Sequence, residues 1–485
     1  MPSSTPFFDA FGSLLFGRPA RSLRDQLCAK LRTESISELQ EAFGSMIHEV
    51  LLCPQQNGIG SRQRRFSPLL TFWAFLSQVI SPNSSCREAV RKVQAWWALR
   101  GQVEISPDTS AYCQARARLP EKTLGCIHEQ LADRLESNVP SQSLWLGRNV
   151  RIVDGTNLSM PDTGENQAAY PQPSSQKPGC GFPMMKLVGI FSLASGALLH
   201  FARGTLGVHE SQLFRQLWNN LRIGDVILSD RGFCSFFSIH SLLQLGVDGV
   251  MRLHKSREVD FRRGKRLGKD DFLLQWKKPR QRAAVLSQEE FDALPESLQL
   301  RHIRLAVNVK GFRTRNIILV TTLLDPEAYP AEAIAKLYLQ RWSVELHFRE
   351  IKILLGLDIL SCLSPEMIQK ELIMHVIAYN LVRALMQHAA ICHHVDLDSL
   401  SFKGTLDTLR HFADVMQASH GKPRKQAALL DAMFLIIAQD QLPLRPARSE
   451  PRVKKRRPKN YQLLNKPRKE MSIHPHRNRP KSSLT

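Results

Sequence analysis

The succession of apolar segments between residues 149 and 253 constrains the fold more than any other feature of the sequence. Seven segments are predicted in the order strand, strand, strand, helix, strand, helix, strand. The prediction rests on apolar runs typical of strands, on helical apolar spacing and on the turn residues between the segments. They are Asn149–Val153, Met184–Leu193, Ala197–Arg203, Ser211–Leu221, Asp225–Ser229, Phe236–Leu245 and Val247–Leu253. The chain therefore contains an α/β unit that begins with antiparallel strands and continues in alternation.

This order resembles that of a ribonuclease-H-like core, in which three antiparallel strands precede the alternating part. The resemblance implies a mixed sheet with helices. It also implies catalytic acids at the ends of the first and fourth strands. Asp154 and Asp230 directly follow the predicted first and fourth strands. The predicted fold class is α/β, a ribonuclease-H-like catalytic core with a β-rich insertion, flanked by helical N-terminal and C-terminal regions.

Changes in composition and periodicity divide the chain into six parts. In order, they are a helical N-terminal region (1–140), for which the family resemblance described below implies DNA binding, the first part of the core (145–254), a β-rich basic insertion (255–330), the second part of the core with a polar-striped helix (331–400), a C-terminal helical region (401–445) and a disordered basic tail (446–485).

The charge is strongly positive and points to a polyanionic partner. The net charge of the 485 residues is +22, and the tail alone holds 13 Lys or Arg against two acidic residues. Lys255–Arg282 in the insertion holds 11 against four. Nucleic acid is favoured over a membrane surface, because no apolar run reaches the roughly 18 residues of a membrane span. No signal-peptide pattern opens the chain, so export is not expected.

The cysteines argue against a disulfide scaffold or a zinc ribbon. All nine are scattered, and no pair has the spacing C-x-x-C, which is typical of reduced thiols in a cytosol. Cys392-His393-His394 has no second ligand pair at zinc-finger spacing, so it is interpreted as a chance cluster.

The helix predicted over Ala331–Leu355 carries an unusual polar arc. At about 100° per residue, Tyr338, Arg341, Glu345 and Lys352 share an arc of roughly 60°. A second polar stripe lies opposite, and apolar residues fill both flanks, so the helix is expected to be largely packed in. The arc is either an internal ion-pair stripe, with Arg341 and Glu345 at i,i+4, or a site for metal and phosphate.

The same residues carry a family resemblance. The spacing Tyr338-x2-Arg341-x3-Glu345-x6-Lys352 resembles the signature of insertion-sequence transposases of the insertion-sequence-four family. Val153–Thr156 and its continuation to Thr163 resemble the first-aspartate region of that family, and Leu228–Phe233 resembles the second. The 115 residues from Asp230 to Glu345 leave room for the β-rich insertion that such enzymes carry.

The resemblance implies a DDE transposase in which Asp154, Asp230 and Glu345 bind divalent metal, two Mg²⁺ with Mn²⁺ as a substitute. Water would cleave the transposon end first, and the released 3′-OH would attack target DNA, in a cut-and-paste reaction through a hairpin intermediate. The DNA-binding residues implied by the family, or suggested by their position near its motifs, are Tyr338, Arg341, Lys352, Trp342, Arg231 and Trp276. For the two tryptophans a core position is the alternative to stacking on a displaced base, and for Arg231 an ion pair is the alternative to a phosphate contact.

The expected partners are double-stranded DNA, as terminal inverted repeats and target, and a second copy of the chain in the DNA complex. The expected location is the bacterial cytoplasm, in association with the nucleoid.

The sequence bears on three other functions. A haloacid-type phosphohydrolase needs an acid two residues before Asp154, where Ile152 stands. A transposase-derived DNA-binding protein without activity and a ribonuclease-H-like structure-specific nuclease remain alternatives. Asp162 is interpreted as a turn residue rather than a ligand, and Glu210 as a first-turn acid of a helix.

Overall fold

A computed structural model describes residues 66–443 except 82–83, 99–100, 102–105, 255, 284, 307–315 and 420, together with Leu464, Lys466, Pro467, Glu470 and Met471. The predicted basic tail, apart from those five residues, and the first 65 residues of the predicted N-terminal region lie outside the described residues. In the described part of the chain, no helix has both the length and the apolar character needed to cross a membrane.

The described residues of the N-terminal region form four helices. Its helices are α4 (Pro68–Ile80), α5 (Cys86–Ala98), α6 (Ser110–Arg118) and α7 (Glu121–Ser137). Ser67 caps α4 by accepting a hydrogen bond from the Leu70 amide, and Pro68 occupies the first helical position, where a missing N–H costs nothing.

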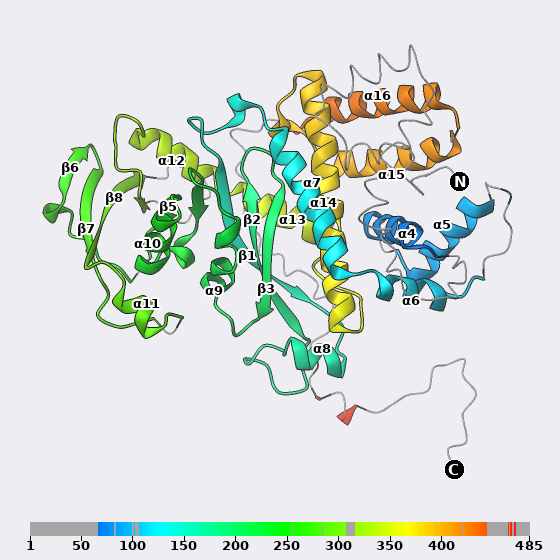
Figure 1. The fold of residues 1–485 in the computed structure, drawn as a ribbon, viewed down its shortest axis with the longest axis horizontal. Coiled ribbons are helices and arrows are strands. Elements are labelled where there is room, and N and C mark those ends of the chain that lie inside the picture. Colours follow the sequence, from blue (N-terminus) through cyan, green and yellow to red (C-terminus); the bar gives the residue numbers. More distant parts are fainter. Residues whose placement is uncertain are drawn as a thin grey trace.

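The strands of the described residues form one nine-stranded sheet, in the order β3-β2-β1-β4-β5-β9-β8-β7-β6 (Figure 1). The strands are β1 (Val150–Ser159), β2 (Met184–Ser192), β3 (Leu198–Thr205), β4 (Val226–Ser229), β5 (Asp248–Arg252), β6 (Lys265–Gly268), β7 (Asp271–Lys277), β8 (Ser297–Ala306) and β9 (Asn316–Thr321). The neighbours β1, β4 and β5 are parallel, and the other pairs are antiparallel, so the sheet is mixed.

The remaining helices lie between and after the strands. They are α8 (Gly164–Ala169), α9 (Glu210–Arg215), α10 (Phe236–Gln244), α11 (Gln288–Asp292), α12 (Ala331–Gln340), α13 (Ser343–Arg349), α14 (Pro365–His393), α15 (Phe402–Ala418) and α16 (Pro423–Gln439). The predicted order of strand, strand, strand, helix, strand, helix, strand is therefore found in β1, β2, β3, α9, β4, α10 and β5.

Alternate residues of β1 face two different cores, as the two-residue period of a strand requires. Ile152 packs with the buried residues of α12 to α16 and the N-terminal helices. Val153 packs on the other face, with Leu213 and Phe214 of α9 and with α10. The sheet is thus covered by helices on both faces, and both predicted parts of the core contribute.

Two predicted details are wrong. The first strand does not end before Asp154, because β1 continues to Ser159 with β2 paired along it from Arg151 onward. The helix predicted over Ser211–Leu221 is divided into α9 and a 3-10 turn at Trp218–Asn220. The strands of the insertion extend the sheet of the core, since β9 pairs with β5.

Helix α14 lies at the centre of the helical side, beside α7 and close to β3 (Figure 1). It is buried along most of its length, and Asn380 inside it bonds both the amide and the carbonyl of Leu198 on β3. This helix joins the N-terminal helices, the sheet and the C-terminal pair α15 and α16.

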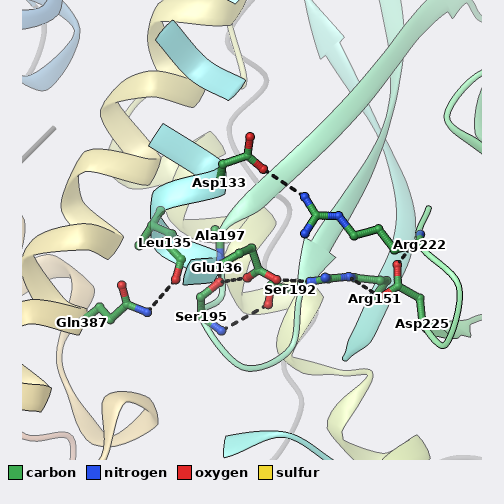
Figure 2. Close-up of polar contacts among 10 residues, drawn as sticks. All are labelled: Asp133, Leu135, Glu136, Arg151, Ser192, Ser195, Ala197, Arg222, Asp225 and Gln387. Atoms are coloured by element: carbon green, nitrogen blue, oxygen red, sulfur yellow. Dashed lines mark hydrogen bonds and ion pairs between the residues drawn. The ribbon is translucent and has the colours of Figure 1, made fainter. Parts of the chain in front are cut away.

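A buried polar network attaches α7 to the start of the sheet (Figure 2). Arg151 of β1 forms ion pairs with Glu136 of α7 and with Asp225 just before β4. The Ser195 hydroxyl, in the turn between β2 and β3, donates to Glu136 at 2.8 Å. Because each buried charge has a partner, the network fixes β1 and β4 side by side without leaving an uncompensated charge.

Candidate functional site

Asp154 and Asp230 lie next to each other at the point where β4 ends. The parallel register pairs Val153 with Ser229, and each aspartate directly follows one residue of this pair. Asp154 is inside β1, while Asp230 follows β4 and begins the 3-10 turn Arg231–Phe233. The sheet therefore brings together two acids that are 76 residues apart in the sequence.

The segment with the polar arc is helical but not one regular helix. Around Arg341 and Trp342 the backbone bonds shorten to i→i+3, which separates α12 from α13, and Glu350–Leu354 forms a π-helical turn. Arg341, at this break, is buried and directs Nη1 to Asp154 Oδ2 at 3.9 Å. The predicted i,i+4 partner Glu345 is not the acid that Arg341 faces.

The two apolar flanks of this segment have different surroundings. One flank is buried against the sheet, as predicted, and includes Val344, Phe348 and Ile351. The prediction that the other flank is packed in is wrong: Leu346 is 56% and Ile353 46% exposed. The helix therefore presents an apolar strip to solvent directly beside Glu345.

Glu345 lies on α13 with its side chain exposed, and its carboxylate makes no hydrogen bond or ion pair with the described residues. Within that part of the chain, no three acidic, histidine or cysteine side chains are close enough together to hold a metal ion. The structure thus brings Asp154 and Asp230 together, with Arg341 beside them, and leaves Glu345 apart.

The donor chemistry at this edge of the sheet nevertheless fits a hard divalent cation, which prefers carboxylate oxygens. Oδ1 of Asp230 is buried without a hydrogen-bond partner, and so is Nε of Arg341. Such groups are costly to bury unless something binds them. An oxygen ligand without a partner is available for a cation, and a guanidinium N–H without a partner is available for an anion.

Burial and charge shift two pKa values at the site. Burial raises the pKa of Asp154 to about 6; a hydrogen bond from the Gly155 amide and the charge of Arg341 oppose this, while Glu210 and Asp230 add to it. Burial likewise raises the pKa of Tyr338 to about 12, against the charge of Arg341. Both groups therefore lie in a low-dielectric environment that strengthens electrostatic contacts.

Lys352 is already bound by the protein. Its ammonium donates to the Thr156 hydroxyl and the Asn157 carbonyl of β1, each at 3.0 Å, and pairs with Asp358 at 2.9 Å. These contacts occupy all three N–H groups and tie the end of β1 to the π-helical turn.

The remaining predicted site residues lie in different environments. Trp342 is partly buried, edge-on to Tyr338, with the Arg341 guanidinium 5.6 Å from its ring centroid. Trp276 is buried in the core on the α9 face, where its indole N–H donates to His302 and a guanidinium, that of Arg257, covers its ring at 3.8 Å. Trp276 therefore occupies a core position, which was the alternative to stacking on a base.

Arg231 follows Asp230 and is half-buried. Asp162 accepts a hydrogen bond from Gln167 at 2.7 Å, in the loop that leads into α8, in keeping with a turn role. Glu210 is in the first turn of α9, as predicted, and its carboxylate lies against β1. A Cβ built on Gly155 would lie 2.8 Å from the Glu210 carboxylate. No local pattern in the sequence signals this contact.

Comparison of the sequence with known proteins identifies a family. A profile described as the transposase DDE domain matches residues 145–381, which include Asp154, Asp230 and Glu345. The chain is 26% identical, over 452 residues, to the transposase InsG for insertion sequence element IS4 of Escherichia coli (strain K12), covering 91% of this chain and 97% of that protein.

Two further matches are more limited. The transposase for insertion sequence element IS421 of Escherichia coli is 34% identical over 70 residues, 14% of this chain and 19% of that protein. A cryo-EM structure of piggyBac transposase in a synaptic complex with hairpin DNA aligns with a TM-score of 0.42 and 11% identity, over 80% of each chain. From the domain profile and the near full-length match to InsG, the chain belongs to the insertion-sequence-four family of DDE transposases.

Proposed function

We propose that this DNA transposase cleaves transposon ends and joins them to target DNA, with Asp154, Asp230 and Glu345 as its catalytic metal ligands. The observation that carries the proposal is the parallel register of β1 and β4, which sets Asp154 beside Asp230 while Arg341, from the Glu345-bearing segment, faces Asp154. Acids held side by side with a buried cationic group match the needs of phosphodiester chemistry.

A bound pair of divalent ions, Mg²⁺ or in its place Mn²⁺, would activate the attacking oxygen and stabilise the leaving oxygen. Asp154 and Asp230 are set to hold such ions from the end of β4, and the exposed Glu345 would complete the set by moving toward them. Since the pKa of Asp154 is about 6 without metal, binding would also displace the residual proton from its carboxyl group.

The basic and hydroxyl groups take separate tasks in this proposal. Arg341 is buried beside Asp154 with a free Nε–H, so it would hold a phosphate oxygen next to the reacting bond. Tyr338 lies in the same environment and would donate its hydroxyl proton to that phosphate. Lys352 has three protein partners, so its main role would be to position β1. It would bind a phosphate only by giving up one of these partners.

The exposed strip supports a contact with an unstacked base. Trp342, Leu346 and Ile353 lie on the flank beside Glu345, and two of them are open to solvent. A base stacked on an aromatic ring gains about 1–3 kcal/mol, enough to hold it out of the duplex. A hairpin intermediate requires a DNA end from which a base is displaced. We therefore propose that the reaction passes through a hairpin. The burial of Trp276 favours Trp342 as the stacking residue.

The wider predictions are retained as proposals. The strand order and the two covered faces of the sheet support a ribonuclease-H-like core, with the division of the chain at the boundaries given above. We further propose that a homodimer acts on two terminal inverted repeats, that Arg231 contacts phosphate, that the N-terminal helices and the basic tail add DNA affinity, and that the protein works at the bacterial nucleoid.

The test uses the full chain with a labelled DNA fragment carrying the terminal repeats of the element, with and without Mg²⁺. The variants Asp154→Ala, Asp230→Ala and Glu345→Ala should each abolish cleavage, and Asp162→Ala, the acid in the nearby loop, should retain it. If all three ligand variants cleave like the wild type, the site assignment is wrong.

The same assay separates the two alternatives. DNA binding without cleavage in Mg²⁺ or Mn²⁺ would identify an inactive derivative. Cleavage of branched DNA without joining to a target would identify a structure-specific nuclease.

A further inference from the structure

Arg252, the last residue of β5, carries a charge for which the described part of the chain supplies no ion-pair partner. Its side chain is only partly exposed and makes no hydrogen bond with the described residues. The buried arginines of β1 and β8, Arg151 and Arg301, in contrast each pair with a carboxylate. A guanidinium that has lost part of its hydration without gaining a partner is free to bind an anion.

The sheet places Arg252 in line with the two aspartates. The parallel register pairs Ser229 of β4 with Met251 of β5, and Asp230 and Arg252 each directly follow one residue of this pair. Asp154 lies one strand further, since β1 and β4 pair in the same way. In sheets of this kind, ligands bind where neighbouring parallel strands end. The position of Arg252 is therefore one at which a ligand is expected.

Strand alternation directs Arg252 to the face of the sheet that α12 covers. On β5, Val250 packs with the buried residues of α12 and α13, and Met251 packs on the α9 side, so Arg252 points to the same side as Val250. Arg341 approaches Asp154 from this side, and α12 packs on β5. The two arginines therefore lie on one face of the sheet.

Tyr338 of α12 lies among these charges. Its hydroxyl is buried without a hydrogen-bond partner, as is Nε of Arg341. Burial raises the pKa of Tyr338 to about 12; the charges of Arg341 and Arg252 oppose this rise, and the charge of Asp230 adds to it. Both guanidinium groups are thus close enough to the hydroxyl to act on it. Two arginines and a tyrosine converge, with donor groups that no acceptor of the described residues uses.

An internal ion pair is the alternative, in which Arg252 would only balance the charge of Asp230. No ion pair joins these two residues within the described chain, and Oδ1 of Asp230 is buried without a hydrogen-bond partner. A structural pair would use this oxygen, because leaving a buried charged group without a hydrogen bond is costly. The aspartate is thus left for a metal ion, and the arginine for an anion.

We propose that Arg252 forms, together with Arg341 and Tyr338, a binding site for one phosphodiester of the DNA end, beside Asp154 and Asp230. This inference rests on the proposed function, in which Arg341 and Tyr338 bind phosphate. Two guanidinium groups and a hydroxyl can donate to both non-bridging oxygens of one phosphate, which fixes its position better than a single arginine does. The site adds β5 to the surface that positions DNA.

The test measures binding of the full chain to duplex DNA carrying the terminal repeat of the element, by fluorescence anisotropy in EDTA, so that neither metal binding nor cleavage contributes. Arg252→Gln removes the charge and retains a polar side chain, and it should weaken binding about tenfold. The matched control is Arg222→Gln, which removes one positive charge just before β4, from an exposed pair with Asp133 (Figure 2). It should bind like the wild type, and an Arg252→Gln variant that does the same would refute the proposal.

A scan with methylphosphonate linkages identifies the phosphate. Each linkage replaces one charged oxygen of the DNA backbone with a methyl group, at one position of the terminal repeat at a time. At the phosphate that Arg252 binds, the wild type should lose more affinity than Arg252→Gln, because the variant has already lost this contact. At every other position the two proteins should lose equally. Equal losses at all positions would overturn the proposal, since Arg252 would then act only through the overall charge.

The cleavage assay with the three metal-ligand variants separates this inference from the proposed function. If Asp154→Ala, Asp230→Ala and Glu345→Ala lose cleavage while Arg252→Gln binds DNA like the wild type, the phosphate site is refuted and the metal ligands stand. If these variants cleave like the wild type while the scan finds one phosphate coupled to Arg252, the metal ligands are wrong and the phosphate site stands. Should Arg252→Gln not fold, Arg252→Met, which keeps the aliphatic part of the side chain, takes its place in the scan with the same two outcomes.

Discussion

Replacing Asp154 with asparagine should stabilise the metal-free protein at neutral pH. The pKa of this carboxyl is about 6 in the folded chain against 3.8 for an ordinary aspartate, chiefly because of burial. Folding therefore has to drive a charged group into surroundings that favour its neutral form. Asparagine has the same shape and no charge, so this cost disappears in the variant.

The sign and the pH range follow from proton linkage. Below pH 3.8 the carboxyl is neutral in both the folded and the unfolded chain and costs nothing. Between pH 3.8 and about 6 the folded state binds more protons, so stability falls as pH rises, and above pH 6 the whole penalty is present. The gap between the two pKa values corresponds to about 3 kcal/mol, an upper limit because the side chain is 26% exposed and solvent screens part of it.

The assay is thermal unfolding of wild type and Asp154→Asn in EDTA at pH 4 and pH 7.5, followed by circular dichroism. The variant should unfold at the same temperature as the wild type at pH 4 and several degrees higher at pH 7.5. Asp162→Asn controls for removing one negative charge from a chain of net charge +22. Excess Mn²⁺ should reverse the order, since only the wild type retains the ligand. A variant no more stable than the wild type at pH 7.5 in EDTA would refute the reasoning.

Three other outcomes are expected. Trp276→Ala should lower the free energy of unfolding by about 3–5 kcal/mol in a denaturant titration, because it empties a buried core position; a loss of DNA binding at unchanged stability would contradict this. Lys352→Met should cost about 1–3 kcal/mol of stability by the same titration and also slow cleavage, since it releases β1 from Asp358; slower cleavage at wild-type stability would instead indicate a direct phosphate contact. Deleting 446–485 should weaken DNA binding and flatten its salt dependence in fluorescence anisotropy, and an unchanged slope would show that these residues do not meet phosphates.

The periodic features of the sequence were sufficient to predict the order of the elements. The apolar runs that became β2, β3, β4 and β5 are short, bounded by turn residues and buried, so their local pattern and their tertiary environment agree. The end of β1 could not be predicted, because Asp154 and the polar residues after it lack the apolar alternation of a strand. They are held in one by pairing with β2, a contact that no local pattern reveals.

The contacts of the candidate site residues could not be predicted from the sequence. Spacing on a helix predicted a shared face for Arg341 and Glu345, yet the helix breaks at Arg341, which turns to an acid on another element. The partner of Arg341 depends on how α12 packs on the sheet. The approach of Glu210 to Gly155 likewise depends on where α9 lies, which a single sequence does not encode locally.

The burial of α14 has a consequence for the chain as it leaves the ribosome. All the residues proposed to bind metal are synthesised before this helix, yet the helix fills the core against which the sheet and α13 pack. A nascent chain that has exposed Glu345 but not α14 therefore cannot complete its fold. We therefore expect a chain that ends before residue 365 to lack a folded site and to be unable to cleave DNA, although it contains all three proposed metal ligands.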